Sequence, residues 1–418
     1  MKIIKFVLFI ILFNFIFGPR FKAIDLLLLT SSILFIASIY YFVFLKKKWI
    51  IAINIPIILL FLGLIYTMLI SGIYQFKDTT SIELILKAIL YLTGAYFIIE
   101  LYYKIYNVKY ENKICNHIFF IGVFNAIFTC LMYIDDNLRS VFIDLLDFSN
   151  TQINWMGGLR VFDLSMGGEA SGSVVFAVLF ILGLNLFYQE KKKYVYFLGL
   201  LFIFAAILFT GRSGLMLAIM GGPLYFFLVL QKDTKKFTQS ILKNGAIFIV
   251  ILSVILVALE FLPEDTKIRF NEKTAMWAFE QYYNYDRGDG FTSKSMSTVI
   301  ENMYFLPEDV IDTIFGSSNF GRKVDVFAYV SSDVGYVRTI HAVGFIGLII
   351  LFSLYVYILF YAYKKRGSSI SINVLLFYTL VTIVFNFKEL HYMPRGGASI
   401  LFLLYISSVF AKRIRANL

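Results

Sequence analysis

The chain has 418 residues, of which 59% are hydrophobic and only 16% are charged, and its mean hydropathy is +0.78. A soluble domain is about half apolar and about a quarter charged, so this composition excludes an ordinary soluble protein. Apolar stretches of roughly 17–25 residues, each long enough to cross a bilayer, recur from end to end. The sequence therefore predicts an all-α, polytopic membrane protein.

We predict about twelve membrane-spanning helices from the apolar stretches. In chain order they lie near residues 3–18, 24–45, 49–73, 83–103, 116–134, 171–188, 194–210, 213–230, 244–262, 334–361, 370–387 and 398–411. The first range resembles a signal peptide, because Lys2 and Lys5 accompany an apolar run. However, the bulky residues 15–17 offer no small-residue cleavage site, so we expect a retained helix.

Basic clusters fall on alternate loops between these predicted helices. They lie at residues 46–48, 104–113, 191–193, 232–236, 364–366 and 412–415. With twelve spans, these loops and both termini share one side of the membrane, which the positive-inside rule assigns to the cytoplasm. The net charge of +11 is then mainly a topology signal, and we expect no nucleic-acid partner because no basic domain lies outside the membrane.

We treat residues 1–418 as a single transmembrane domain with one large insertion. The insertion, residues 263–333, lies between the ninth and tenth spans and should be periplasmic. It contains the amphipathic stretch TAMWAFEQYYNY, the glycine-containing RGDGFTSKS and the sequence STVIENMYF. These patterns predict a small helical cap over the outer face of the membrane.

Polar residues gather at the ends of the predicted helices on this outer face. Eight of them are candidate site residues: Arg160, Glu169, Arg212, Arg287, Asp333, Arg338, His341 and Arg395. Several have structural alternatives, since an arginine near a helix end can snorkel to lipid headgroups and an acid can stabilise a helix N-terminus. Arg287 is better explained as a solvated residue of the cap than as a ligand. For Arg212, the small neighbours Gly211 and Ser213 favour close approach of a ligand.

The stretch SSDVGYVRTIHAVGFIGLIILF places three ionisable residues at the start of the tenth span. On a helix, Asp333, Arg338 and His341 fit within one broad face, with His341 about 12 Å deeper than Asp333. The alternative is an interfacial ion pair between Asp333 and Arg338 and a helix–helix hydrogen bond for His341. We favour a site, because other outer charges can converge on it. In the last outer loop, FKELHYMPRGG, we expect Lys388 and His391 at the membrane interface.

These residue types suit a phosphate-bearing lipid substrate. Arginine offers a planar fork that matches phosphate oxygens, and a nearby carboxylate can accept the proton of an attacking hydroxyl. The cytoplasmic loops are too short to hold a soluble nucleotide-sugar, so we expect a lipid-linked donor. No zinc-type spacing and no DxD pair is present, so we expect neither a metal nor a cofactor.

The chain resembles the O-antigen polymerases and their relatives, the O-antigen ligases. Its topology is similar over most of the chain, and its motifs are most similar at GGLRVFDLSMGGEAS, LFTGRSGLML, IFGSSNFGR and SDVGYVRTIHAVGFIGLI. The resemblance implies an inverting, metal-independent glycosyltransferase of the bacterial inner membrane. Its donor and acceptor would be glycans on undecaprenyl diphosphate. The ligases generally carry a histidine where this chain has Asp333, which favours a polymerase.

Transferred onto this sequence, the resemblance implies roles for individual residues. Asp333, with Arg338 and Glu169, would be catalytic, and Asp333 would replace the base of the ligases. Diphosphate or glycan would be bound by arginines and a histidine: Arg160, Arg212, Arg287, His341 and Arg395. Partners would be the lipid bilayer and, in the same pathway, a chain-length regulator and a flippase.

Other functional classes remain open from the residues alone. A lipid-linked oligosaccharide flippase should carry charges at mid-membrane depth and have only short outer loops. A peptidoglycan-type polymerase should keep an essential acid in its large outer loop. A membrane acyltransferase should have an embedded histidine near a cytoplasmic acyl donor, whereas His341 is predicted on the opposite side.

The alternating basic loops generate a topology prediction. Single cysteines introduced at Lys191 and Lys364 should react only with membrane-permeant reagents in intact cells, because both loops are predicted to be cytoplasmic. Cysteines placed between Glu264 and Ser332 should react with impermeant reagents. Protection of the long segment from an impermeant reagent would contradict both the topology and the site.

Overall fold

The computed structural model describes residues 2–43, 51–148, 153, 161–165, 169–230, 234–288, 290, 293–321 and 330–417. Within these ranges all regular secondary structure is helical, apart from isolated bridges between Arg20 and Asp25 and between Phe21 and Leu146. The predicted all-α class is therefore confirmed for the described part of the chain.

Each predicted span corresponds to a helix among the described residues. These helices are α1 (Lys2–Phe17), α2 (Leu26–Val43), α3 (Ile51–Ile73), α4 (Thr80–Tyr106), α5 (Tyr110–Ile134), α8 (Glu169–Gln189), α9 (Lys193–Thr210), α10 (Arg212–Leu230), α11 (Thr234–Glu260), α17 (Gly335–Lys364), α18 (Ile370–Phe385) and α19 (Gly397–Asn417). Most boundaries agree closely. The largest difference is at α11, which begins at Thr234 because the basic, polar residues before its apolar part are also helical.

By length and apolar composition, six segments of the described chain could each cross a membrane. They are Asn54–Ile73, Thr80–Ile134, Ser171–Gln189, Lys193–Thr210, Leu242–Glu260 and Gly335–Lys364. The second segment contains α4 and α5, joined by the 3₁₀ turn η1 (Asn107–Lys109). These long apolar helices support the prediction of a multi-pass membrane protein.

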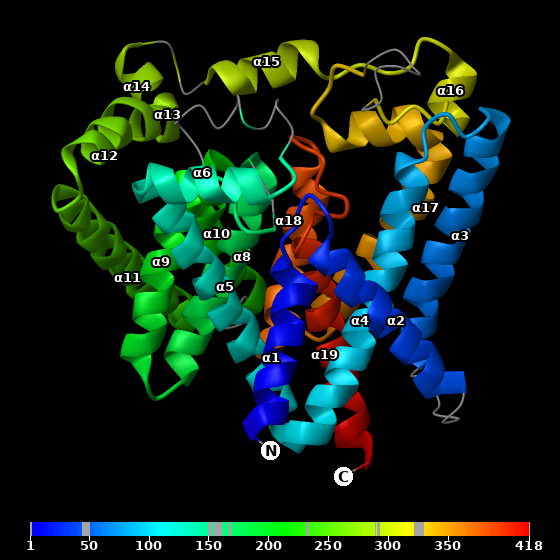
Figure 1. Ribbon diagram of the computed structural model, residues 1–418, viewed down its shortest axis with the longest axis horizontal. Coiled ribbons are helices and arrows are strands. Elements are labelled where there is room, and N and C mark those ends of the chain that lie inside the picture. The colour runs from blue at the N-terminus through cyan, green and yellow to red at the C-terminus, as the bar shows by residue number, and fades with distance from the viewer. Residues whose placement is uncertain are drawn as a thin grey trace.

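The long helices stand side by side, with both chain termini at one end of the bundle (Figure 1). At the opposite end lie short elements of the segment between α11 and α17: α12 (Glu264–Arg269), the π-helical turn η2 (Phe270–Ala275), α13 (Met276–Ala278), α14 (Glu280–Asp286), α15 (Lys294–Asn302) and α16 (Val310–Phe315). We call this segment, from Glu264 to Gly321, the cap. The end of the bundle that it covers is the cap end. The helix α6 (Asp136–Leu145) lies near the same end.

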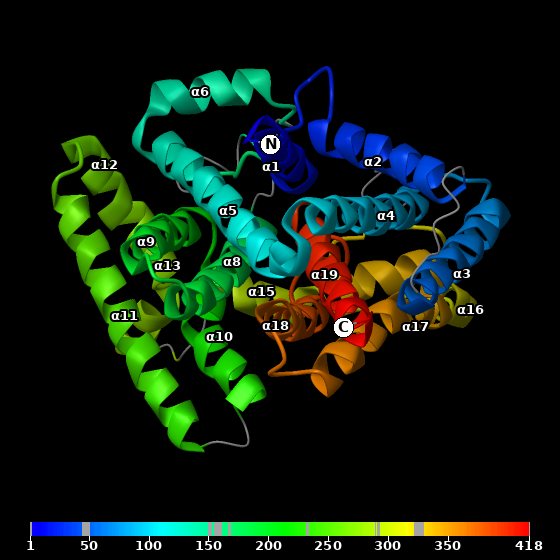
Figure 2. The same cartoon turned by 90° about the horizontal axis from the view of Figure 1, so that it is seen from below.

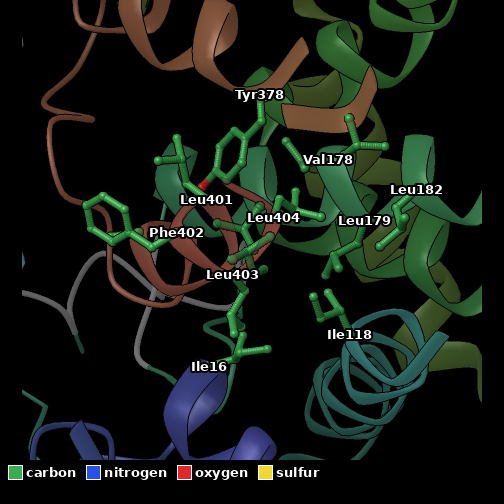
Figure 3. Packing of buried hydrophobic residues seen from close by; sticks show 14 of the residues in the cluster. Ile16, Ile118, Val178, Leu179, Leu182, Tyr378, Leu401, Phe402, Leu403 and Leu404 are labelled. Atoms are coloured by element: carbon green, nitrogen blue, oxygen red, sulfur yellow. The ribbon is translucent and has the colours of Figure 1, made fainter. Parts of the chain in front are cut away.

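The core is formed where α5, α8, α18 and α19 meet. Ile118, Leu179, Tyr378 and Leu403 are fully buried there, and Ile16 of α1 closes one side (Figure 3). At the periphery, α3 and α11 lie at opposite edges of the bundle (Figure 2). Most of α11 is exposed, including its apolar side chains, as is expected for a helix that faces lipid.

Glycine allows close helix packing at several crossings. A Cβ atom at Gly183 of α8 would lie 2.3 Å from the ring of Phe119 on α5. At Gly199 of α9 the same ring would be 2.7 Å away. Small residues at such positions let helix backbones approach, which is a main source of association energy in membranes.

Helix α17 is broken at Gly344, where φ is +66°. The carbonyls of His341 and Ala342 accept hydrogen bonds from the backbone N–H groups of Ser317 and Ser318, both at 2.9 Å. A Cβ atom at Gly344 would lie 2.3 Å from the carbonyl oxygen of Ile314. The cap therefore docks directly into the break and fixes the first turns of α17, which carry Arg338 and His341.

The contact between α8 and α10 generates a stability prediction. A Cβ atom at Gly214 would lie 2.2 Å from the backbone oxygen of Ser173, whereas a Cβ atom at Gly222 of the same helix would meet nothing within 4 Å. We expect Gly214→Ala to destabilise the protein by about 1–3 kcal/mol through overpacking. Gly222→Ala should be neutral or slightly stabilising. Thermal unfolding in detergent measures both, and equal midpoints would contradict the packing described here.

Candidate functional site

The residues around α15 connect the cap ends of three long helices. At the start of α15, the hydroxyl of Ser295 accepts a hydrogen bond from Arg212, the first residue of α10. Beyond its end, Met303 accepts one from Ser332, just before α17, and the hydroxyl of Tyr304 donates to the carbonyl of Phe387, just after α18. Charged residues on these three helix ends are therefore brought under one cap element.

Arg212 is enclosed by the cap. Its Nη1 forms an ion pair with the carboxylate of Glu280, and its Nη2 donates to the Ser295 hydroxyl at 2.9 Å. The face of the guanidinium lies over the ring of Trp277, with Cζ 4.7 Å from the ring centroid. Only 13% of the Arg212 side chain is exposed, so it does not snorkel towards lipid headgroups.

A second cation lies beside Arg212. The Nζ of Lys388 donates to the hydroxyl of Ser213 at 2.9 Å, which joins the end of α18 to the start of α10. The next residue, Gly214, donates its N–H to the hydroxyl of Ser173 at 3.0 Å. The sequence GRSG thus combines an arginine, a hydroxyl and close backbone packing at one helix start.

Arg338 and Asp333 form the third charged group at this end. Arg338 is buried, donates through Nε to the carbonyl of Ser332, and has its Nη2 3.6 Å from Asp333 Oδ1. Asp333 precedes the first helical residue of α17, and 51% of its side chain is exposed. This is the ion pair that the sequence offered as an alternative. Its geometry still leaves much of the Asp333 carboxylate open to solvent.

His341 is one turn deeper in α17 and contacts the cap from below. Its ring packs edge-on against Phe305, with centroids 5.4 Å apart. Its buried Nε2 has no hydrogen-bond partner. His341 therefore lies at the junction of the cap and the broken helix, and its Nε2 does not form the helix–helix hydrogen bond that the sequence offered as an alternative to a site.

Arg395 is engaged in a clamp at another place. Its two terminal nitrogens bind both oxygens of Asp25, at 2.6 and 2.8 Å, and Nη2 also donates to the carbonyl of Gly18 at 2.9 Å. This joins the turn between α1 and α2 to the loop between α18 and α19. The observed contacts of Arg395 are structural, whereas the sequence suggested a ligand contact.

The structure describes the remaining candidates only in part. Arg287 is an exposed residue at the end of α14. Glu169 is the first residue of α8, and Arg160 lies outside the described residues.

The sequence did not identify the cap partners of Arg212. Trp277, Glu280 and Ser295 lie in stretches that we interpreted only as amphipathic cap helices. The spacing of Trp277 and Glu280, three residues apart, was a usable signal because such residues share a helix face. Asp163 was also missed: it is buried and accepts hydrogen bonds from Ser165 at 2.7 Å and Asn125 at 3.2 Å. The feature that could have identified Asp163 is its position as a single acidic residue in the sequence VFDLS.

Among the residues that the structure describes, no group of three or more His, Cys, Asp or Glu side chains could hold a metal ion. Comparisons with protein-family models, curated proteins and solved structures found no match to this chain. A functional assignment therefore depends on the motifs and on the geometry of the cap end.

His391 differs from the expectation of an interfacial side chain. It is buried at 1% exposure in the loop between α18 and α19, beside the ring of Phe385, and both ring nitrogens lack hydrogen-bond partners. The loop is held by its own polar group, since the His391 N–H donates to the side chain of Asn386 at 3.0 Å. Burial lowers the pKa of the imidazole to about 3.

This burial predicts an acid-sensitive fold. Below pH of about 6.5 the unfolded chain takes up a proton on His391 that the folded chain does not accept until about pH 3, so stability falls as pH falls through that window. Between pH 7 and 5 we expect a loss of about 2 kcal/mol from this residue. Unfolding midpoints of the wild type and of His391→Gln, compared across this range, measure the contribution. Parallel pH profiles would show that His391 is not buried as a neutral ring.

Proposed function

We propose that this protein is a polysaccharide polymerase of the O-antigen polymerase type. In this proposal it joins oligosaccharide repeat units carried on undecaprenyl diphosphate, at the periplasmic face of the bacterial inner membrane. The product would be O-antigen or a related surface polysaccharide. The transfer is inverting and independent of a metal.

One observation carries the proposal: Arg212, Lys388 and the Asp333–Arg338 pair lie on helix ends that are linked through α15 and through Ser213. Two cations and a half-exposed carboxylate at the same end of the bundle match the needs of a reaction that expels a diphosphate and deprotonates a hydroxyl. Three of the four motifs that resemble the polymerases supply parts of this end: they contain Arg212, the Ser317–Ser318 loop and the start of α17.

The chemistry assigns a role to each group. A terminal sugar hydroxyl of one lipid-linked unit attacks the anomeric carbon of the glycan on the other, forming the new glycosidic bond. The bond from that carbon to the diphosphate oxygen breaks, and undecaprenyl diphosphate leaves. Asp333 accepts the hydroxyl proton. Arg212, with Lys388, stabilises the negative charge that develops on the departing diphosphate.

Arg338 acts as a positioning residue in this scheme, because it is buried and holds both the Ser332 carbonyl and the Asp333 carboxylate. His341 lies under Phe305 and supports the same segment. Arg160 and Glu169 belong to the scheme through the motif GGLRVFDLSMGGEAS. The clamp with Asp25 gives Arg395 a structural part, and Arg287 stays a peripheral candidate for glycan contact.

The topology is part of the proposal. All twelve long helices cross the membrane, the termini lie in the cytoplasm and the cap lies in the periplasm. Both termini are at the end of the bundle opposite the cap, as an even number of crossings requires (Figure 1). A flippase and a chain-length regulator of the same pathway are the expected protein partners.

A paired substitution tests the catalytic assignment. We expect Asp333→Asn to reduce polymerisation by about 10²–10⁴-fold, the usual contribution of a general base, and to leave single repeat units on the acceptor. His341→Ala should have a milder effect through packing. The measurement is the glycan ladder, normalised to the amount of protein in the membrane.

The matched control is Asp286→Asn, which removes the same charge from an exposed position at the end of α14. It should leave the ladder unchanged. Long chains from Asp333→Asn together with none from His341→Ala would reverse the assignment and make the histidine the base.

A further inference from the structure

The guanidinium of Arg212 is already paired with an anion, and that anion is a carboxylate of the same protein. The carboxylate of Glu280 pairs with Nη1, and the hydroxyl of Ser295 accepts from Nη2 at 2.9 Å. Trp277 covers the guanidinium face, 4.7 Å from Cζ. All three partners come from the cap, whereas Arg212 belongs to α10. A complete anion site is therefore formed only while the cap lies on the bundle.

Carboxylate and phosphate compete for such a site. The guanidinium presents a planar set of N–H donors that fits either group, and both of its terminal nitrogens are occupied here, Nη1 by Glu280 and Nη2 by Ser295. A phosphate that takes the two terminal nitrogens of Arg212 must therefore displace Glu280. Lys388, which binds the neighbouring Ser213 hydroxyl, adds a second positive charge that favours the ligand with more negative charge.

The cap is anchored on both sides of this contact. On one side, Arg269 binds both oxygens of Asp136, at 2.8 and 2.9 Å, and Thr274 is hydrogen-bonded to Tyr133 at 2.7 Å. On the other, the hydroxyl of Tyr74 donates to Asp312 at 2.6 Å. Between these anchors, the elements α13 to α15 contact α10 through the three cap partners of Arg212.

We propose that Glu280 is an internal ligand of the Arg212 site and that the phosphate of a diphosphate group displaces it. This inference rests on the proposed function, because that function supplies a lipid diphosphate at this face. A phosphate on both terminal nitrogens displaces the Ser295 hydroxyl together with Glu280, which releases α14 and the start of α15 from α10. Since Ser332 is bonded to Met303 beyond the end of α15, the release also reaches the segment that holds Asp333 and Arg338.

The test measures binding, which does not depend on turnover. Trp49→Phe and Trp155→Phe leave Trp277 as the one tryptophan of the full-length protein, since the chain has three. Its fluorescence is followed in nanodiscs while inorganic pyrophosphate is added, and in nanodiscs that contain undecaprenyl diphosphate. The two arms distinguish a free diphosphate from a lipid headgroup.

In this background, Glu280→Gln should bind both ligands about two- to fivefold more tightly, the factor expected when a partly exposed competing ion pair is removed. The matched control is Glu272→Gln, an exposed acid of the same cap. It should bind both ligands with the same affinity as the protein that carries only the two tryptophan substitutions. Arg212→Lys should lose most of the binding, because a point charge does not replace the fork.

Unchanged or weaker binding by Glu280→Gln in both arms overturns the inference. A gain of equal size from Glu272→Gln also overturns it, because the effect would then come from general charge. Tighter binding of pyrophosphate alone overturns the lipid headgroup as the ligand. Failure of the proposed function looks different: the wild type would form no polymer from lipid-linked repeat units, while Glu280→Gln would still bind both diphosphates more tightly.

Discussion

Arginine–carboxylate pairs hold the cap end of this protein together, and the arrangement of the elements at that end depends on them. Arg395 binds Asp25, Arg269 binds Asp136, and Arg212 binds Glu280. Each pair joins elements that are distant in the chain. A charge placed against an apolar helix bundle is costly unless it is paired and hydrogen-bonded, so these arginines constrain where their partners lie. The fork geometry of arginine adds direction to that constraint.

The pairs divide into two kinds with different consequences. The Arg395 and Arg269 pairs use both oxygens of their carboxylates, and each arginine also binds a backbone carbonyl, of Gly18 and of Tyr133. The terminal nitrogens of both arginines are therefore occupied by groups of the protein. The Arg212 pair connects α10 to α14, in the part of the cap between the Arg269–Asp136 pair and the Tyr74–Asp312 hydrogen bond. This is the pair for which we propose displacement by a ligand, and such displacement would couple binding to the position of the cap.

The break in α17 also needs partners from the cap, in this case for its backbone carbonyls. An interrupted helix in an apolar bundle exposes carbonyls that need donors, and here Ser317 and Ser318 of the cap supply them. The short first part of the helix, with Arg338 and His341, is consequently part of the cap assembly as much as of the bundle. Chemistry at Asp333 would depend on cap residues that never contact a substrate.

The sequence by itself determined the elements whose causes are local. Apolar length predicted the helices, and alternating basic loops predicted that both termini lie at the same end of the bundle, because bilayer thickness and charge act on each segment alone. It also indicated the charged helix ends at Arg212 and Asp333. It did not reveal Glu280 as the partner of Arg212, the clamp of Arg395 on Asp25, or the burial of His391. Those features join residues as much as 370 positions apart, and only the packing of the helices decides which side chains meet, because any of several carboxylates satisfies an arginine equally well in the sequence.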